Sequence, residues 1–312
     1  MIRTPVAEPA IAPTLTIAEA PASRLATRSS RGPFTQALIR TLRNPMGLFG
    51  FGILALLILI AVGAPVVAPY HPNAQHDGDE LVPPGQTGYL LGTDELGRDI
   101  LSRIIWGARV SLVVGLVAVG LGAGIGVPTG LAAGYFGGWL DTIIMRLWDA
   151  LLAFPGILTG IAIVSVLGPG AINVAIALAI VNVPEFSRLT RACVLRERER
   201  DYILAARCLG GSDRRLIVRH LVPNCLPPLL VQLSLSMGFA VLLEASLSFL
   251  GLGTQAPDPS WGSMLNDSRT FLRQAPWYGI FPGVALAILL IGLNYLSDAL
   301  RLALDPRRIN TI

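Results

Sequence analysis

The chain has 312 residues, of which 53% are hydrophobic and only 14% are charged, and its formal net charge is +4. A soluble domain carries about 25% charged residues, so this composition indicates a protein that is embedded in lipid. All 24 basic residues are arginine, and without lysine the chain cannot contain a Gly-Lys-Ser/Thr phosphate-binding loop or form a lysine Schiff base. Any ATP hydrolysis linked to its function must therefore reside in another polypeptide.

Six apolar segments follow an N-terminal tail. Residues 1–43 contain five prolines and six arginines and no apolar run of the signal-peptide type, which predicts a flexible tail. A helix needs about 20 apolar residues to cross the core of a bilayer. The candidate spans are 46–67, 110–132, 143–166, 172–183, 229–252 and 281–296. The sequence thus predicts an all-α, polytopic membrane protein with six transmembrane helices.

The spans differ in regularity. Arg146, Asp149 and Pro155 interrupt the third, and the fourth is short and ends at Pro184. Asp149 lies three residues from Arg146, about one helical turn, which favours an ion pair between them. Glycines in the second span predict close packing against another helix without identifying which one; they are Gly115, Gly120, Gly122, Gly124, Gly126 and Gly130.

Glu244 is a second acidic residue inside the predicted spans, and its position bears on function. No basic residue lies within a helical turn of it, and Ser246 and Ser248 follow. A carboxylate in a bilayer must face a wet cavity or find partners inside the helix bundle. Two roles therefore remain open for Glu244: lining a translocation path together with Ser246 and Ser248, or hydrogen bonding to a neighbouring helix.

The arginines also predict how the chain is oriented. The tail, the segment 191–226 and the segment after residue 297 hold seventeen arginines, whereas the loops 71–103 and 253–276 hold four. Because positive charge favours the cytoplasmic side of a membrane, we expect 191–226 and both termini in the cytoplasm. The loops 71–103 and 253–276 are expected outside.

The sequence suggests neither a metal site nor a cofactor. The cysteines, at 193, 208 and 225, have no Cys-x-x-Cys spacing, and the three histidines are isolated. Asp94, Glu95 and Asp99 lack the spacing of a calcium-binding loop. We expect these carboxylates to pair with nearby arginines instead.

The stretch 201–224 is an arginine-rich island between two spans, too polar to cross a bilayer. A helix is predicted from about residue 201 to 209, followed by a Gly210-Gly211 hinge and by Ser212, a suitable N-cap for a second short helix. Two interpretations remain open from these residues alone. The island either binds a soluble partner or is a positively charged loop that sets the topology.

The sequence Ala205-Ala206-x-x-x-Gly210, with Pro223 thirteen residues later, resembles the loop by which permease subunits of bacterial ABC importers contact their ATPase. Further segments resemble the second permease subunit of dipeptide, oligopeptide, nickel or glutathione importers: 91–103, 148–155, 244–253, 259–262 and 303–307. The chain departs from the family at Leu204, where glutamate is usual, and at 220–223, where His-Leu-Val-Pro replaces Ile-x-Leu-Pro.

This resemblance implies a type I ABC importer permease with one leading helix and a five-helix core. The expected partners are a homologous second permease, two cytoplasmic ABC ATPases and an extracytoplasmic binding protein, at a bacterial cytoplasmic membrane and without nucleic acid. Dipeptides or oligopeptides are the expected substrates, with nickel and glutathione as alternatives. The expected regions are a cytoplasmic tail (1–43), a first span with an extracytoplasmic loop (44–108), a permease core containing the coupling loop 191–226 (109–303) and a cytoplasmic C-terminal tail (304–312).

The resemblance also implies roles for particular residues. The residues expected to couple to the ATPase are Ala205, Ala206, Arg207, Gly210, Gly211, Arg214, Arg215 and Pro223. An extracytoplasmic cap, where the binding protein docks, is expected to contain Asp94, Arg98, Asp99 and Arg103. The chain itself is expected to catalyse no reaction.

Two other classes of polytopic membrane protein are alternatives. A proton-driven secondary transporter needs no ATPase, but its matched broken helices in two halves are not evident in the sequence. An intramembrane enzyme needs paired catalytic groups, for which Asp149 and Glu244 are the only carboxylate pair. Neither class explains the Ala-Ala-x-x-x-Gly sequence of the island.

Overall fold

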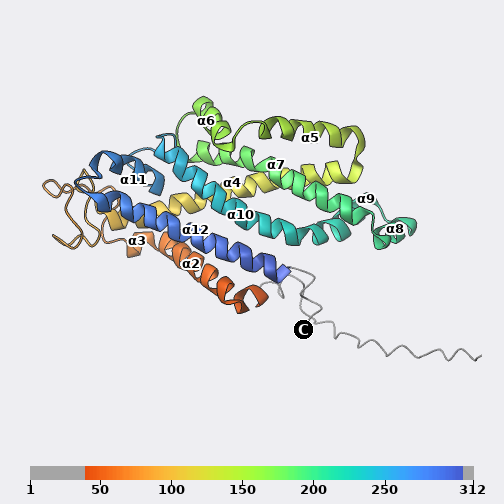
Figure 1. Cartoon of the computed structure of the whole chain (residues 1–312), viewed down its shortest axis with the longest axis horizontal. Helices are drawn as coiled ribbons and strands as arrows, with labels where there is room; N and C mark the ends of the chain where they lie inside the picture. The colour runs from red at the N-terminus through yellow and green to blue at the C-terminus, as the bar shows by residue number, and fades with distance from the viewer. Residues whose placement is uncertain (1–38, 305–312) are drawn as a thin grey trace, which may run out of the picture.

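The computed structural model describes residues 39–304, which form an elongated bundle of helices (Figure 1). Within these residues five helical segments are long and apolar enough to cross a membrane: α2 (Pro45–Val62), α4 (Ile100–Phe136), α7 (Ala171–Arg198), the segment Asp213–Phe249 and α12 (Pro276–Leu304). A sixth crossing results if α5 (Gly138–Leu152) and α6 (Gly156–Leu167) are counted as one broken span. The predicted all-α membrane fold is confirmed. Most of the predicted tail and nearly all of the predicted C-terminal segment lie outside the described residues.

The third predicted span, 143–166, is not a straight helix. α5 and α6 meet at an angle of 90° across the break at residues 153–155. Pro155 disfavours helical geometry at the residue before it and has no amide hydrogen to donate. Pro155 itself is extended, with ψ of 134°, and α6 begins directly after it. The proline that interrupts the predicted span therefore turns the chain.

The predicted end of the fourth span was wrong, because α7 continues through Pro184 to Arg198. A proline inside a helix costs about 3 kcal/mol. Close contacts with α4 continue on both sides of Pro184, where Gly122 meets Asn182 and Gly130 meets Ser187. This packing holds the second half of α7 in line with the first.

Glycines on α4 explain that close contact. Those facing α7 recur every fourth residue: Gly122, Gly126, Gly130 and Gly134. A Cβ atom on Gly130 would lie 2.3 Å from the carbonyl oxygen of Ser187, so only glycine permits this approach. Of the other predicted glycines, Gly115 faces Met237 on α10, whereas Gly120 and Gly124 face open space. The predicted close packing is present, and its partner is mainly α7.

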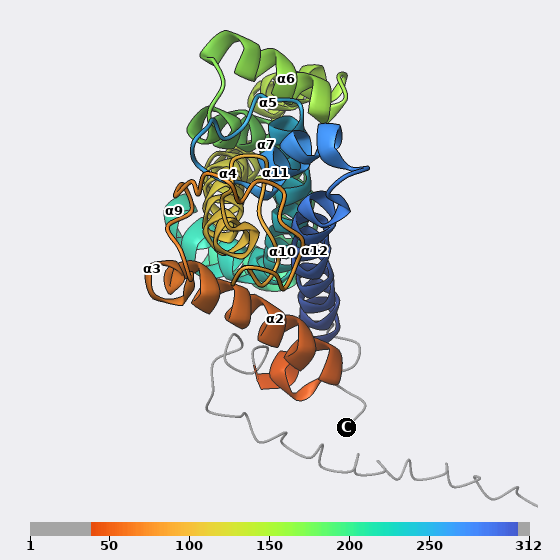
Figure 2. The same cartoon turned by 90° about the vertical axis from the view of Figure 1, so that its left-hand side faces the viewer.

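The remaining helices surround this pair. α10 (Val222–Phe249) packs on α4, α7 and α12, and α2 lies along α12 at the edge opposite to α5 and α6 (Figure 2). The short helices α3 (Ala64–Val67) and α11 (Trp261–Ser268) and the 3-10 turn η2 (Arg269–Phe271) lie at one end of the bundle, whereas α8 (Asp201–Cys208) and α9 (Asp213–Leu216) lie at the other (Figure 1). The loops predicted to be outside are thus at the opposite end of the molecule from the island.

Candidate functional site: the α8–α9 surface

The island folds into α8, a turn at Gly210 and Gly211, and α9; we refer to residues 201–216 as the α8–α9 surface. Gly210 has φ of +79°, a conformation that side chains with a Cβ rarely adopt. Gly211 is needed for a different reason, because a Cβ there would lie 2.7 Å from the carbonyl oxygen of Ala206. The two glycines therefore allow α8 and α9 to fold back closely on each other.

The second helix of the island is not the separate short helix that the sequence predicted. α9 continues through a π-helical turn, η1 (Ile217–Leu221), directly into α10. Pro223, at the start of α10, cannot donate the usual hydrogen bond to the carbonyl four residues earlier. In the turn before it, the amide of Val222 bonds to the carbonyl of Ile217, five residues back, and the helix continues without a break. The part of the island that follows the glycine turn is therefore the first part of a transmembrane helix.

Three apolar side chains fix the α8–α9 surface to the bundle. Ile203 of α8, Leu216 of α9 and Leu221 of η1 are fully buried and belong to the main hydrophobic core. Burying a leucine or isoleucine side chain contributes about 1.5–3 kcal/mol each. The surface is thus held in place by packing as well as by charge.

Tyr135, near the end of α4, connects both helices of the island. Its hydroxyl donates a hydrogen bond of 2.5 Å to Asp213 of α9 and accepts one of 3.4 Å from Arg207 of α8. The Arg207 guanidinium also lies 5.8 Å from the centre of the Tyr135 ring, within cation–π range. One aromatic side chain therefore ties α4 to α8 and α9.

A second polar connection links α7, α8 and α10. The buried carboxylate of Glu197 accepts a hydrogen bond of 3.1 Å from the Tyr202 hydroxyl and forms an ion pair of 3.1 Å with Arg200. The Tyr202 hydroxyl in turn accepts a bond of 3.0 Å from Asn224. Burial, together with the hydrogen bond to Glu197, raises the pKa of Tyr202. The tyrosine therefore stays protonated as a donor at neutral pH.

The side chains that this framework presents are apolar and cationic. Leu209, at the turn, is 88% exposed, and Leu204 is 48% exposed. The arginines beside them are also exposed: Arg207, Arg214 and Arg215. Among the small residues, Ala205 is exposed and Ala206 is half-buried, and Pro223 is exposed at the start of α10. At the position where the related loop usually has glutamate, Leu204 adds apolar contact surface.

At the opposite end, Asp94 is the centre of a buried ion-pair cluster. One of its oxygens lies 2.6 Å from Nε of Arg98 and 3.3 Å from Nε of Arg103. The other oxygen accepts hydrogen bonds of 2.9 Å from the amides of Leu96 and Arg98. The expected pairing of carboxylates with Arg98 and Arg103 is thus present in the structure.

Asp99 and Arg103 extend this cluster to neighbouring segments. Asp99 caps the N-terminus of α4 by accepting a bond of 2.8 Å from the amide of Ser102. Arg103 donates bonds of 3.1 Å to the carbonyl of Pro72 and 3.4 Å to that of Pro257. All four predicted cap residues are buried, so they shape the loop rather than offer a contact surface. Docking of a binding protein at this end stays a prediction.

Within the bundle, Glu244 of α10 is hydrogen bonded to a neighbouring helix, the second of the two roles left open for it. It is buried and accepts hydrogen bonds of 3.1 Å from Ser111 on α4 and 2.8 Å from Ser248. Ser248 is buried with it, so neither side chain lines an open path in this conformation. Ser246 is half-buried, and its hydroxyl donates to the carbonyl of Leu242.

The expected Asp149–Arg146 ion pair is replaced by another. Asp149 pairs at 2.5 Å with Arg188 on α7, and Asp141 of α5 pairs at 2.5 Å with Arg191. Sequence reasoning missed Glu185 and Gln232 as well, which join α7 to α10 by a hydrogen bond of 3.0 Å. Because the predicted fourth span ended before Pro184, the polar residues that follow on α7 were not assigned to a membrane helix. Continuing the helical pattern through the proline would have revealed it.

A family model described as "Binding-protein-dependent transport system inner membrane component" matches residues 126–310, and one described as "N-terminal TM domain of oligopeptide transport permease C" matches residues 32–84. The chain belongs to the family of binding-protein-dependent transport inner membrane components, the permease subunits of ABC importers. The resemblance noted in the sequence is confirmed, and the family is one of transport permeases.

Curated relatives are similar over most of their length. The dipeptide transport system permease protein DppC of Alkalihalophilus pseudofirmus is 45% identical over 88% of this chain and 90% of the relative. The glutathione transport system permease protein GsiD of Pectobacterium atrosepticum is 42% identical over 90% of this chain and 93% of the relative. Among solved structures, an inward-facing MetNI methionine ABC transporter matches 66% of this chain and 98% of its own, with 18% identity and a TM-score of 0.54. That match supports the permease fold.

Proposed function

We propose that this chain is a permease subunit that forms, with a homologous second permease, the translocation path for dipeptides or oligopeptides across a bacterial cytoplasmic membrane. One of two separate ATPases binds at the α8–α9 surface of this chain, and an extracytoplasmic protein delivers the substrate. The names of the relatives support the peptide class, and glutathione, itself a small peptide, is the alternative that they also favour.

The observation that carries this proposal is the exposed Leu209 on a firmly anchored turn. A loop that served only to set topology would need positive charge but no apolar tip. Here Leu209 is almost fully exposed, while Ile203 and Leu216 beside it are buried. A rigid surface with an exposed apolar centre and cationic neighbours is typical of a protein interface. An ATPase with an apolar groove and an acidic rim would fit it.

The connections of this surface explain how ATPase closure could drive transport. α9 is continuous with α10 through η1, Tyr135 joins the surface to α4, and Glu197 joins it to α7. A displacement of the α8–α9 surface therefore acts on three membrane helices together. The two permeases would rock against each other, and the substrate path would open alternately to the two sides.

The test is to replace Leu209 by aspartate in the assembled importer and to measure ATPase co-purification and peptide uptake. Because Leu209 packs against little of its own chain, the variant is expected to insert normally but to lose most ATPase binding. Val66→Asp is the matched control, since Val66 is 90% exposed on α3 at the opposite end. Full ATPase association and uptake in the Leu209 variant would contradict the proposed contact.

Substrate and energy source are tested separately with the wild-type importer in proteoliposomes. Uptake of a labelled dipeptide should require ATP inside the ATPase-facing compartment and should persist when an uncoupler removes the proton gradient. Competition by unlabelled dipeptide, oligopeptide, glutathione and Ni²⁺ then ranks the substrates. Uptake driven by the proton gradient without ATP would identify a secondary transporter instead.

A further inference from the structure

Four polar side chains form a continuous face halfway along the transmembrane helices. Glu185 and Arg188 lie one turn apart on α7, Gln232 of α10 donates to Glu185 at 3.0 Å, and Asp149 of α5 pairs with Arg188. Glu185 is near the middle of the 28 residues of α7, roughly 20 Å from either end. We refer to these four residues as the mid-depth polar face.

This face does not point into the helix bundle. Glu185 is exposed, and the side chains of Arg188 and Asp149 are 49% and 45% exposed. Charged groups at mid-membrane are too costly to face lipid and normally face a wet cavity. Among the described residues Glu185 makes no ion pair, and its carboxylate accepts a hydrogen bond from the uncharged Gln232 amide. The face is therefore suited to border water rather than acyl chains.

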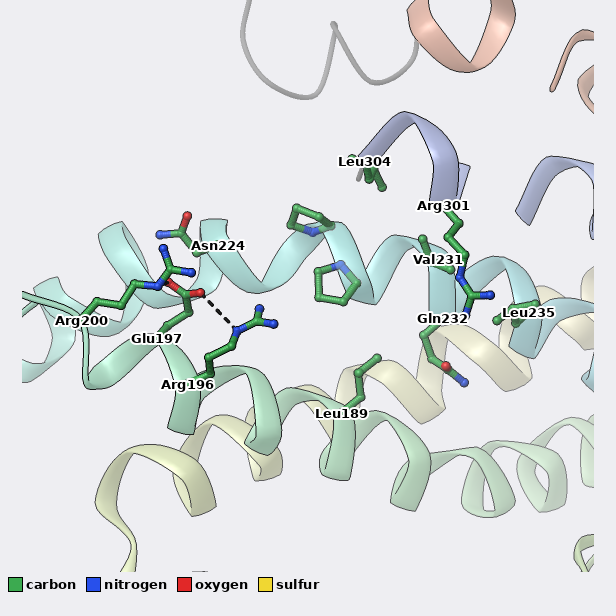
Figure 3. Close-up of a pocket in the computed structure, with 12 residues that line it drawn as sticks. Leu189, Arg196, Glu197, Arg200, Asn224, Val231, Gln232, Leu235, Arg301 and Leu304 are labelled. Atoms are coloured by element: carbon green, nitrogen blue, oxygen red, sulfur yellow. Dashed lines mark ion pairs between the residues drawn. The ribbon is translucent and has the colours of Figure 1, made fainter. Parts of the chain in front are cut away.

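A cleft connects the mid-depth polar face with the end of the bundle that carries the α8–α9 surface. The cleft has a volume of about 630 Å³ and lies between α7, α10 and the end of α12 (Figure 3). Arg196 and Arg200 lie at one end of it, and Gln232 lies at the other end, near Arg301 (Figure 3). Gln232 is also the partner of Glu185. An open route lined by both polar and apolar side chains thus leads from the helix ends to mid-depth.

We propose that the mid-depth polar face is the wall of the substrate path and that it binds the two charged ends of a peptide, with Glu185 taking the ammonium group and Arg188 the carboxylate. This inference rests on the proposed function. Side chains one helical turn apart are separated by about 5–6 Å at their Cβ atoms. An extended dipeptide spans at most about 7 Å, so its two termini match this separation.

The pairing of Arg188 also explains how a bound peptide is released. Arg188 is paired with Asp149, so a peptide carboxylate must compete with Asp149 for the guanidinium. Such competition keeps the binding weak, as a transport path requires. Beyond Gln232, the arginines of the cleft offer the next attraction for the carboxylate on the way to the cleft mouth.

Accessibility is the first test. Glu185→Cys is introduced into the importer together with Cys208→Ser, because Cys208 is exposed whereas Cys193 and Cys225 are buried. A charged, water-soluble methanethiosulfonate should label residue 185 from the side of the ATPases, and a saturating dipeptide should slow the labelling. Leu116→Cys, exposed near the middle of α4, is the control that should stay unlabelled. An unreactive residue 185 would mean that the face is covered by a partner protein and would overturn the proposal.

Charge is the second test, with the complete importer in proteoliposomes. In Glu185→Gln, the amount of dipeptide taken up per ATP hydrolysed should fall about tenfold through loss of a charge-assisted contact. Glu185→Asp should recover most of the uptake. Unchanged uptake per ATP in Glu185→Gln would refute this inference alone. Absence of peptide uptake in the wild-type importer would instead refute the proposed function.

Discussion

The hydroxyl of Tyr135 donates a hydrogen bond of 2.5 Å to the carboxylate of Asp213 and thereby joins the end of α4 to the beginning of α9. Because Arg207 donates to the same hydroxyl, Tyr135 is the shared partner of both helices in the α8–α9 surface. The relationship fixes the surface to a helix that is remote from it in the sequence.

Tyr135→Phe should keep the ring beneath Arg207 and remove both hydrogen bonds. We expect a loss of about 1 kcal/mol in stability and a lower ratio of uptake to ATP hydrolysis, because the surface moves with less of α4. Tyr295→Phe is the control, since Tyr295 makes an edge-on ring contact with Phe49 at 5.5 Å in another part of the bundle. Equal ratios of uptake to hydrolysis in both variants and the wild type would contradict the proposed connection.

Asp94→Ala should destabilise the outer loops strongly. The change leaves the guanidinium groups of Arg98 and Arg103 buried without their shared carboxylate, which typically costs about 3–5 kcal/mol. Asp77→Ala, an exposed acidic residue of the same loop, should have little effect. Thermal denaturation of the purified importer measures both variants. A wild-type melting temperature for Asp94→Ala would show that the cluster contributes no stability.

Asp267 of α11 gives a prediction about pH. Burial, reinforced by the negative charge of Glu95, raises its pKa above the ordinary value, although Arg98 and Arg103 oppose the shift. A raised pKa in the folded state means that the protonated form is favoured, so its stabilising contribution is complete below about pH 4 and is lost as the pH rises through the folded pKa.

Asp267→Asn should therefore raise the melting temperature at pH 7 and make less difference near pH 4. The exposed Asp258 offers a control, and Asp258→Asn should change the melting temperature little at either pH. A lower melting temperature for Asp267→Asn at pH 7 would show that the carboxylate is stabilised by the arginines after all.

Orientation in the membrane can be tested with two thiol positions at opposite ends of the bundle. Gln86→Cys in the outer loop should react with an impermeant maleimide in intact cells, whereas Cys208, exposed on α8, should react only after permeabilisation. Residue 86 is preferable to the neighbouring Gly88, whose φ of +88° does not suit a cysteine. Labelling of Cys208 in intact cells would reverse the orientation inferred from the arginines.

The long apolar helices and the residues of the island could be predicted from the sequence, because hydropathy and glycine spacing are local signals. The course of α7 through Pro184 could not, since it depends on glycines of α4 more than fifty residues earlier. The partner of Asp149 was mispredicted for a related reason. A residue on the same helix was preferred to Arg188, and only the folded chain brings α5 against α7.

The path residues show the same limit. Glu244 and Ser248 were candidates because they are polar within an apolar span, but the sequence does not say which way they face. In the structure they are buried and hydrogen bond to each other, while Glu185 is exposed and accepts a bond from the half-buried Gln232. The direction of a side chain relative to the bundle requires the packing of at least three helices.

The uninterrupted run from α9 through η1 to α10 has a mechanical consequence. Its 37 residues form a rod about 55 Å long, with the α8–α9 surface at one tip. Tilting such a rod by about 10° displaces the far tip by roughly 10 Å, more than the length of an extended dipeptide. A small angular stroke at the tip next to the α8–α9 turn is therefore geometrically sufficient to open or shut a passage at the other tip.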